Sequence, residues 1–423
     1  MKTFDFFKTV RRGATLMMML LFIVPVWAQD ASYFTVKGVV KDKKSGKTLE
    51  YVNVSVPGTD IGTVTNVNGE FVLKIKESVK VKSVAISHIG YSTTRFNVKP
   101  ENTELLTVFL VPNPNLLNEI TIYSNDPLAL VERAIKNIYK NYSNNDKLLT
   151  GFYRETIKKN RTFINVSEAV VDVFKSPYDQ GVIRDNVQIL KGRKLISPDP
   201  KDTLMVKLLG GPTLSVFVDI VKNPELVLDP NTLNYYRFSM SEAVMIDDRS
   251  HYVVNFEPNI TLEYALYYGK LFIDKETFNI SRAEFNLSMD DKNKATQAIL
   301  RKKPFGLRFK PELISFMVNY KSVDGRSRLN YIRSEVKFQC DWTRKLFKTN
   351  YTIVAETVIT GVREENALKI PYRMAFRENQ SLSDKVSSFT DPDFWEDYNI
   401  IAPDESLETA VSKLKKANVR AGN

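Results

Sequence analysis

Few residues of this chain have the type and spacing that catalysis or metal binding requires. Its 423 residues include two histidines, His88 and His251, and one cysteine, Cys340. A zinc peptidase of the His-x-x-Glu kind needs a glutamate three residues after a histidine, and neither histidine has one. The chain also lacks a phosphate-binding glycine loop and a G-x-S-x-G nucleophile turn. We therefore expect a protein that is not an enzyme and that uses no cofactor.

Three of the adjacent pairs of acidic residues could suggest general acid and base chemistry. Neighbouring side chains on a strand point to opposite faces, so the two members of such a pair do not act on one substrate. The surrounding residues predict turns at all three places. The pairs are Asp247–Asp248, Asp290–Asp291 and Glu364–Glu365.

A specific polar site is expected in the segment Phe-Tyr-Arg-Glu, at Arg154 and Glu155. The two charges form either a pair at the mouth of a cavity or an exposed ion pair of at most ~1 kcal/mol. Aromatic residues are frequent in the strands that follow. Together with Tyr153, Tyr267 and Phe272, the two charged residues make a candidate site for an apolar or amphipathic ligand.

A basic stretch between residues 292 and 310 has no acid after Asp291 and carries Phe305, Leu307 and Phe309. Such a mixture of cations and aromatic or aliphatic groups can lie on an anionic membrane surface, and a solvated loop is the alternative. The candidate anionic-surface patch consists of Arg301, Lys302, Lys303, Arg308 and Lys310.

The N-terminus predicts the compartment. A basic start is followed by the apolar run of residues 14–24, which is too short to span a bilayer, and then by Val26-Trp27-Ala28. This is the pattern of a secretory signal peptide, residues 1–28, cleaved after Ala28. We expect an exported protein, in the periplasm or associated with the outer membrane. The net charge of +11 favours anionic partners such as lipid headgroups, and it is too diffuse to indicate nucleic acid.

Residues 33–112 alternate apolar and polar side chains, with turn residues between the runs, such as Asn68-Gly69. About seven short strands predict a small antiparallel β-sandwich. The segment, with Gly38, Pro57-Gly58 and Gly90-Tyr91, resembles the carboxypeptidase regulatory-like domain, a transthyretin-like sandwich of exported Bacteroidetes proteins. The resemblance implies an accessory domain and no peptidase activity. Residues 113–125 then read as a linker with one edge strand.

Residues 126–423 predict a second, larger domain. Asp126-Pro127 begins a helix with an apolar stripe through Tyr142. Consecutive hairpins of long strands follow, with turns at Lys159-Asn160, Asp247-Asp248 and Asp324-Gly325, and predict a curled antiparallel meander. The helix and these strands resemble the carrier proteins of the LolA type. The expected fold class is therefore mainly β: a transthyretin-like sandwich followed by a LolA-like half-barrel with a few helices.

Three further observations bear on modification, buried residues and function. Asp202-Thr203-Leu204 resembles the O-glycosylation site of exported Bacteroidetes proteins, which makes Thr203 a candidate. Phe394 and Trp395 are expected to plug one end of the sheet, with a calcium or sugar site at residues 393–398 as the alternative. The function we expect is a non-enzymatic envelope module that binds a lipid or acyl chain in the curled sheet. The alternatives are an assembly protein that meets envelope proteins through its sandwich and, last, an unrecognised hydrolase.

Overall fold

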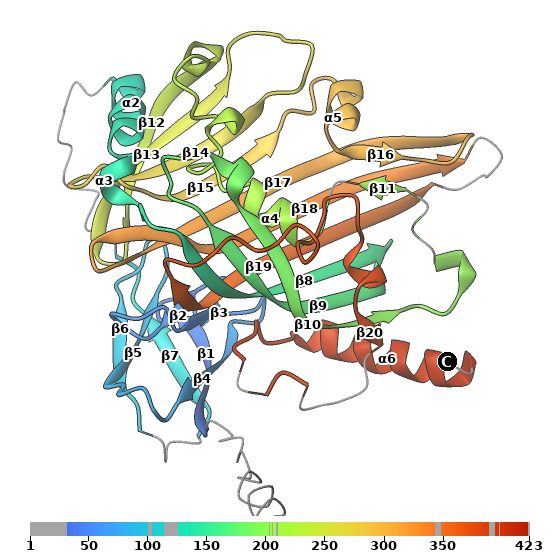
Figure 1. Ribbon diagram of the computed structural model, residues 1–423, viewed down its shortest axis with the longest axis horizontal. Helices are drawn as coiled ribbons and strands as arrows, with labels where there is room; N and C mark the ends of the chain where they lie inside the picture. Colours follow the sequence, from blue (N-terminus) through green and yellow to red (C-terminus); the bar gives the residue numbers. More distant parts are fainter. Residues whose placement is uncertain are drawn as a thin grey trace, which may run out of the picture.

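The computed structural model describes residues 32–99, 104–113 and 126–421, apart from 203, 205, 209, 343–347, 389–393 and 397. The predicted signal peptide, the predicted edge strand of the linker and the candidate Thr203 lie outside these residues. The described chain forms a small β-sandwich that packs against a large curled sheet (Figure 1).

Seven strands of the described chain form the sandwich, as two sheets with the orders β4-β1-β7 and β3-β2-β5-β6. Their inward side chains, such as Val40, Phe71 and Ile86, make a separate apolar core. The expectation of a purely antiparallel sandwich was wrong at one edge, because β7 pairs with β1 in parallel. The strands are β1 (Tyr33–Asp42), β2 (Asn53–Ser55), β3 (Gly62–Val64), β4 (Glu70–Lys76), β5 (Ser83–Ser87), β6 (Thr94–Asn97) and β7 (Leu106–Leu110).

The large sheet has eleven strands within the described residues, in the order β12-β13-β14-β15-β17-β18-β19-β8-β9-β10-β20. The last strand of the meander, β19, thus pairs with β8, the first strand of the domain. The strands are β8 (Lys147–Lys159), β9 (Thr162–Lys175), β10 (Asn186–Ile196), β12 (Tyr236–Ile246), β13 (Arg249–Pro258), β14 (Tyr267–Asp274), β15 (Ile280–Leu287), β17 (Leu307–Val323), β18 (Arg326–Trp342), β19 (Thr349–Glu365) and β20 (Ser387–Ser388), with a separate pair β11 (Lys207–Leu208) and β16 (Leu300–Lys302).

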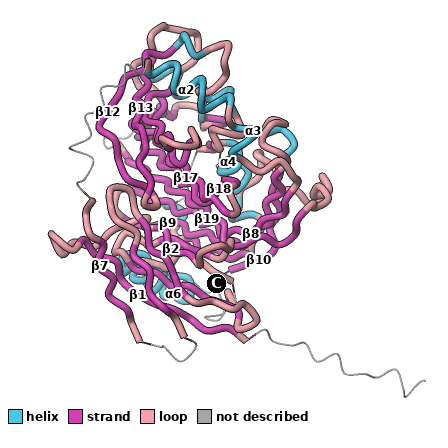
Figure 2. Tube along the Cα trace, turned by 90° about the vertical axis from the view of Figure 1, so that its left-hand side faces the viewer, coloured by secondary structure: helices cyan, strands magenta, loops and turns pink. Residues whose placement is uncertain are grey.

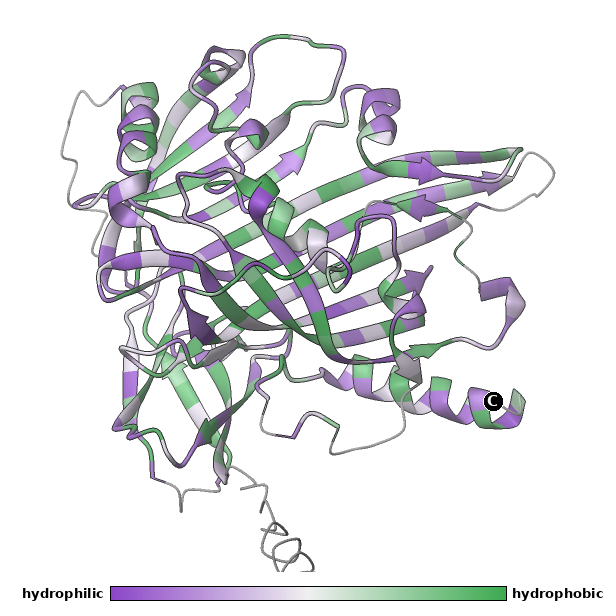
Figure 3. Cartoon of the chain, in the orientation of Figure 1, coloured by the Kyte–Doolittle hydropathy of each residue, from purple (hydrophilic) through white to green (hydrophobic). Residues whose placement is uncertain are grey.

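The predicted hairpins are confirmed, and their turn residues explain why. Asn160, Asp247, Asp248 and Asp324 all have positive φ values between 51° and 60°. Among residues other than glycine, asparagine and aspartate adopt this conformation most readily, so their positions fix the hairpin ends. Along the long strands, hydrophobic and hydrophilic residues alternate, as the green and purple bands of Figure 3 show.

The helices are short, except the last. The expected helix through Tyr142 is broken at Asn137 into α2 and α3. Asp126 caps α2 as predicted, since its side chain accepts a hydrogen bond from the Leu128 N–H at 3.0 Å. The helices are α2 (Pro127–Lys136), α3 (Ile138–Asn141), α4 (Pro212–Phe217), α5 (Lys292–Ile299) and α6 (Glu405–Ala421), with 3₁₀ turns η1 (Val182–Arg184), η2 (Pro200–Asp202), η3 (Pro224–Leu226), η4 (Leu233–Tyr235) and η5 (Leu382–Asp384).

The outer face of the sheet holds the sandwich, which Figure 2 shows beneath it. Tyr51 of the sandwich stacks on Tyr331 of β18 at 6.1 Å between ring centroids. The Thr63 hydroxyl donates to the Ile400 carbonyl at 2.9 Å, and Trp395 is buried in the same interface. Trp395 is therefore a core residue between the two domains. No helix within the described ranges has the length and apolar character needed to cross a membrane.

The inner, concave face of the sheet is filled over only part of its area. Segment 212–235 lies on it and contributes Val216, Ile220 and Leu228 to the main core, which also contains Leu130 and Val131 of α2. Beyond this filled part, the concave face remains open as a pocket, described next.

Candidate functional site

The open part of the concave face is a pocket of about 1340 Å³, which we call the concave pocket. The ends of β8, β9 and β19 form its floor, and the residues around 202–213 and 369–384 form its walls. These elements lie on the right-hand side of Figure 1. A volume above the ~300–1,000 Å³ of ordinary small-molecule sites suits a ligand with long chains.

The floor of the concave pocket is aliphatic. Ile157 of β8, Ile164 of β9 and Ile353 of β19 point into it, and Leu204 and Val206 contribute from the wall. The same residues belong to a hydrophobic cluster that continues beneath the pocket to Phe338 and Cys340. Cys340 is a buried residue of strand β18, and burial raises its pKa to about 11.

Strand β8 carries one carboxylate beside this aliphatic floor, whereas the other carboxylates of the lining, Asp185, Asp202, Glu378 and Asp384, belong to the walls. Glu155 lines the pocket and accepts a hydrogen bond from the Tyr153 hydroxyl at 3.0 Å. The backbone N–H of Gly211 donates to the same carboxylate. Burial raises the pKa of Glu155 above its usual value, and these two hydrogen bonds partly oppose the shift. The pocket thus combines an apolar floor with walls that carry charged groups, and Glu155 is the carboxylate held beside that floor.

The loop Gly210-Gly211 covers this carboxylate. Gly211 has a φ of +82°, and a Cβ there would lie 2.7 Å from the ring of Phe376. A Cβ on Gly210 would lie 3.8 Å from the Glu155 carboxylate. Only glycine combines this φ value with this contact, so the two walls of the pocket meet where Gly211 packs on Phe376.

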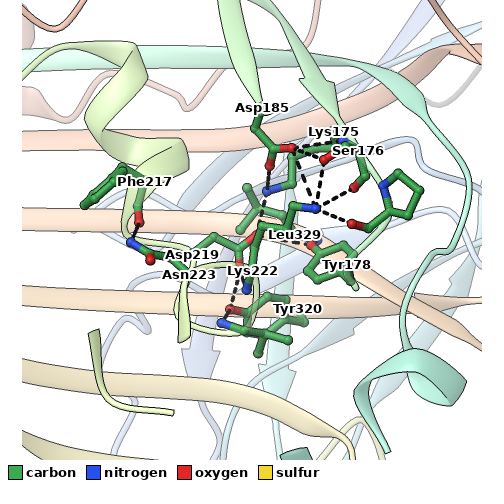
Figure 4. Close-up of polar contacts among 12 residues, drawn as sticks. Lys175, Ser176, Tyr178, Asp185, Phe217, Asp219, Lys222, Asn223, Tyr320 and Leu329 are labelled. Carbon is green, nitrogen blue, oxygen red and sulfur yellow. Dashed lines mark hydrogen bonds and ion pairs between the residues drawn. The ribbon is translucent and has the colours of Figure 1, made fainter. Parts of the chain in front are cut away.

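A buried cluster of charges lies beside the pocket and fixes the segment that fills the rest of the concave face (Figure 4). Lys175 Nζ lies 2.7 Å from Asp185 Oδ2 and 2.8 Å from Asp219 Oδ2. The Tyr320 hydroxyl donates to Asp219 Oδ1 at 2.6 Å, which links β17 to the cluster across the sheet. Lys222 donates to the Ser176 hydroxyl at 2.9 Å.

The two lysines of this cluster respond differently to burial. For Lys175 burial lowers the pKa, but the carboxylates of Asp185 and Asp219 outweigh it and hold the pKa above its usual value. For Lys222 burial dominates and lowers the pKa to about 8. Two carboxylates and two ammonium groups nearly balance, so the cluster is a structural unit that joins β9, β17 and segment 219–222.

The candidate ligand residues are not one site, because strand alternation separates them. Arg154 points to the outer face, where it pairs with Glu168 at 2.7 Å and donates to the Ile401 carbonyl at 2.8 Å. It is buried and does not pair with Glu155, so both the mouth-of-cavity pair and the exposed pair were wrong predictions. Of the five residues predicted, Glu155 alone lines the concave pocket within the described chain.

The other two aromatic candidates lie in the walls of the fold. Tyr267 packs edge-on against Phe285, with ring centroids 5.5 Å apart, in the filled part of the concave face. Phe272 is buried on the opposite face, where the Arg282 guanidinium lies 6.0 Å from its ring. Both side chains therefore stabilise the sheet and do not reach the pocket.

Strand alternation separates the apolar from the basic residues of the predicted patch. Leu307 and Phe309 are buried, since the stretch continues as strand β17 and not as a solvated loop. Arg301, Lys302, Lys303 and Arg308 are exposed, and their contact with an anionic membrane stays a prediction. Phe305 is fully exposed. Arg301 reaches the mouth of the concave pocket and pairs with Glu378 at 3.4 Å. The remaining members are Lys302 on β16, Lys303 at the turn, and Arg308 and Lys310 on β17.

The remaining candidates for chemistry have structural partners. The His88 ring packs on the Tyr91 ring, with centroids 5.5 Å apart, and His251 contacts the Ser281 hydroxyl at 2.8 Å. Asp247 and Asp248 form a hairpin turn, whereas Glu364 and Glu365 end strand β19 and correct the prediction of a turn there. Among the described residues, no group of three His, Cys, Asp or Glu side chains is close enough to hold a metal ion.

The sequence reasoning missed the walls of the pocket and the charge cluster. The walls carry no periodic pattern, and their residues lie far apart in the chain. A signal for the cluster exists: Asp219 and Lys222 are isolated charges within the apolar run 214–228, and charges at such positions are buried in pairs.

Comparison with known proteins gives one clear match. Residues 36–122 match the model of the CarboxypepD_reg-like domain. In the same region the chain is 33% identical over 92 residues to the TonB-dependent receptor SusC of Bacteroides thetaiotaomicron, which is 22% of this chain and 8% of the receptor. The chain therefore spans a small part of this relative's length.

Two solved structures show lower similarity. A DUF1329 family protein from Desulfovibrio piger aligns with 55% of this chain and 92% of its own, at 12% identity and a TM-score of 0.24. The LolA superfamily protein NE2245 from Nitrosomonas europaea aligns with 61% of this chain and 100% of its own, at 10% identity and a TM-score of 0.23. Such scores do not establish a shared fold. The match therefore concerns the region of the sandwich: residues 36–122 are similar to a carboxypeptidase regulatory-like domain.

Proposed function

We propose that this protein is a non-catalytic binding module of the cell envelope that holds an apolar or amphipathic ligand in the concave pocket. The observation that carries the proposal is the aliphatic floor of a pocket of about 1340 Å³, with the Glu155 carboxylate held beside that floor by the Tyr153 hydroxyl. A lipid or an acylated peptide fits this arrangement, because its chain would lie on Ile157, Ile164 and Ile353. Its polar end would lie near Glu155 or the pocket mouth.

The absence of catalysis is part of the proposal. It is supported by the way in which the protein engages two of the pocket's carboxylates. Glu155 accepts from Tyr153 and Gly211, and Asp185 is paired with Lys175. Carboxylates held in this way serve the fold or orient a ligand.

An envelope location follows from the N-terminus and is also part of the proposal. Residues 1–28 have the composition of a signal peptide with cleavage after Ala28. The relative that shares the regulatory-like domain is a TonB-dependent receptor, which supports export to the periplasm or the outer membrane.

The test is native mass spectrometry of residues 29–423 purified from the native envelope, with lipid extraction of the same sample. We expect a bound lipid or acylated peptide in near-unit ratio. A fluorescent fatty acid should then bind the delipidated protein. A bare mass combined with no binding of the fluorescent fatty acid would refute the proposal.

A pocket-filling variant makes the test specific. Ile353→Trp places an indole on the pocket floor, and we expect it to weaken fatty-acid binding at least about tenfold, or ~1.4 kcal/mol. Ile260→Trp, at an exposed position outside the pocket, is the matched control. If Ile353→Trp does not fold, as judged by circular dichroism, Leu204→Trp in the wall tests the same point. Equal binding by the pocket variant and the control would contradict the proposed site.

The alternative, an assembly protein that binds envelope proteins through the sandwich, is favoured by one specific observation. Leu105, Phe109 and Val111, in and beside strand β7, expose their side chains at the edge of the sandwich. Cross-linking in the native envelope, with Phe109 replaced by a photoreactive residue, tests it. We expect no specific protein adduct at this position if the protein is a lipid-binding module alone.

A further inference from the structure

Segment 367–377, which follows β19 and borders the concave pocket, displays large apolar side chains to solvent. It is anchored by Ala367, Ile370 and Phe376, all of which are buried. Between these anchors, three side chains project outward: Leu368 is 90% exposed, Tyr372 75% and Met374 54%. Apolar groups on a single anchored segment are unusual on a free surface and indicate contact with another apolar phase or partner.

The charges of the same segment have one sign. Lys369, Arg373 and Arg377 are exposed, and no acidic residue lies between Glu365 and Glu378. Glu378 is itself paired with Arg301 at 3.4 Å. The segment therefore presents cations and apolar side chains in alternation, which is the composition of a surface that meets anionic lipids.

A second, basic pocket of about 610 Å³ lies on the other side of the segment. It is lined by Lys191, Arg373, Arg377 and Lys385, and no carboxylate belongs to its described lining. Glu396 lies outside this lining and pairs with Lys191 at 2.8 Å. A pocket of this composition can receive an anionic headgroup such as a phosphate.

The segment also lies at the mouth of the concave pocket. Ile370 and Tyr372 line that pocket, and the Asn186 side chain donates to the Ile370 carbonyl at 3.1 Å. Ile183, which precedes Asn186 by three residues, lines the pocket and is also exposed. An apolar phase that contacts Leu368, Tyr372 and Ile183 would thus face the opening of the pocket.

We propose that segment 367–377 docks the protein on an anionic membrane surface. Leu368, Tyr372 and Met374 enter the headgroup region, and the neighbouring cations meet lipid phosphates. The docking itself does not depend on the proposed function, but its purpose does. It would turn the mouth of the concave pocket toward the membrane from which a lipid would enter. It is distinct from the patch at residues 301–310, where Leu307 and Phe309 are buried and Phe305 is exposed.

The experiment is co-sedimentation of residues 29–423 with vesicles of phosphatidylethanolamine and phosphatidylglycerol, compared with vesicles of phosphatidylcholine alone. We expect binding to the anionic vesicles that weakens as salt is added. The triple variant Leu368→Ser, Tyr372→Ser and Met374→Ser should reduce the partition coefficient at least about tenfold. The double variant Tyr139→Ser and Val419→Ser removes exposed apolar side chains elsewhere and is the matched control.

A direct readout comes from Tyr372→Trp. Its fluorescence should shift to shorter wavelength when anionic vesicles are added, whereas Val419→Trp should not shift. Failure of the wild-type protein to bind anionic vesicles, or equal binding by the triple variant, would overturn the proposal. Loss of a dimer in the triple variant, without vesicle binding by the wild type, would instead assign the surface to a second copy and would also overturn it.

Docking and ligand binding can be separated. The double variant Leu368→Ser and Met374→Ser, whose residues do not line the concave pocket, should bind the fluorescent fatty acid in vesicle-free solution as tightly as the wild-type protein. If vesicle binding fails while fatty-acid binding persists, the docking proposal falls and the pocket proposal stands. Loss of fatty-acid binding by the wild-type protein concerns the pocket proposal alone.

Discussion

The buried charge cluster provides the sharpest test of the architecture, through the substitution Asp219→Asn. Asp219 accepts from Lys175 at 2.8 Å, Tyr320 at 2.6 Å and Tyr178 at 3.2 Å. The asparagine keeps the shape but loses the charge, and the cluster then holds an excess positive charge away from water. Removing one partner of a buried ion pair costs about 3–5 kcal/mol. Since folded proteins are stable by about 5–15 kcal/mol, this is a large part of the total.

The assay is urea unfolding followed by circular dichroism, with a control pair of similar geometry and opposite burial. Arg237 and Glu257 are separated by 2.6 Å, but both are exposed. Glu257→Gln should therefore cost less than about 1 kcal/mol. Tyr320→Phe removes one hydrogen bond to the Asp219 carboxylate and should cost about 1.5–3 kcal/mol. If Asp219→Asn costs no more than Glu257→Gln, burial does not set the strength of this cluster and the reasoning is refuted.

Three further predictions concern the pocket carboxylate, acid stability and the pocket wall. Because burial raises the folded-state pKa of Glu155 above 4.5, ionisation costs stability as pH rises through that pKa. Glu155→Gln should therefore be more stable than wild type at neutral pH, with a difference that closes toward about pH 4.5 in urea titrations. Burial, with Arg282 nearby, lowers the pKa of His88 from 6.5 to about 4, so stability should fall as pH drops through this interval. His88→Gln should remove that part of the pH dependence, and an unchanged slope would contradict it. Gly211→Ala should destabilise by at least about 1–2 kcal/mol in thermal unfolding, because its φ is +82° and its Cβ would meet Phe376, whereas Gly210→Ala should be nearly neutral.

The hairpins could be predicted from the sequence because their information is local. Asn160, Asp324 and Gly325 are residues of types that tolerate positive φ, and the strands on both sides alternate apolar and polar residues. The sandwich was predictable for the same reason, since Asn68-Gly69 punctuates its strands. The parallel pairing of β1 with β7 is not local, and nothing within either strand distinguishes it from an antiparallel edge.

Other parts of the fold depend on contacts between distant residues. The sequence of β10 mixes charged residues with Gly192 and therefore does not predict a strand. Glycine is required at this position because a Cβ would collide with the side chain of Val386, which is distant in the chain. Arg154 is expected at a surface from its type, and it is buried because Glu168 and the Ile401 carbonyl are brought to it by β9 and the C-terminal segment. Neither partner is within ten residues of it in the chain.

The row of inward side chains on β8 shows where the filled core ends and the concave pocket begins. Leu149 and Tyr153 belong to the main core, and Ile157 belongs to the aliphatic floor of the pocket. Glu155 lies between them, at the boundary. An apolar side chain at position 155 would avoid the desolvation cost that raises the pKa of Glu155. A buried charge that costs stability, placed where a core gives way to an open apolar surface, is expected where a ligand's polar group must be met. The boundary position of Glu155 is therefore an argument for ligand binding that is independent of the volume of the pocket.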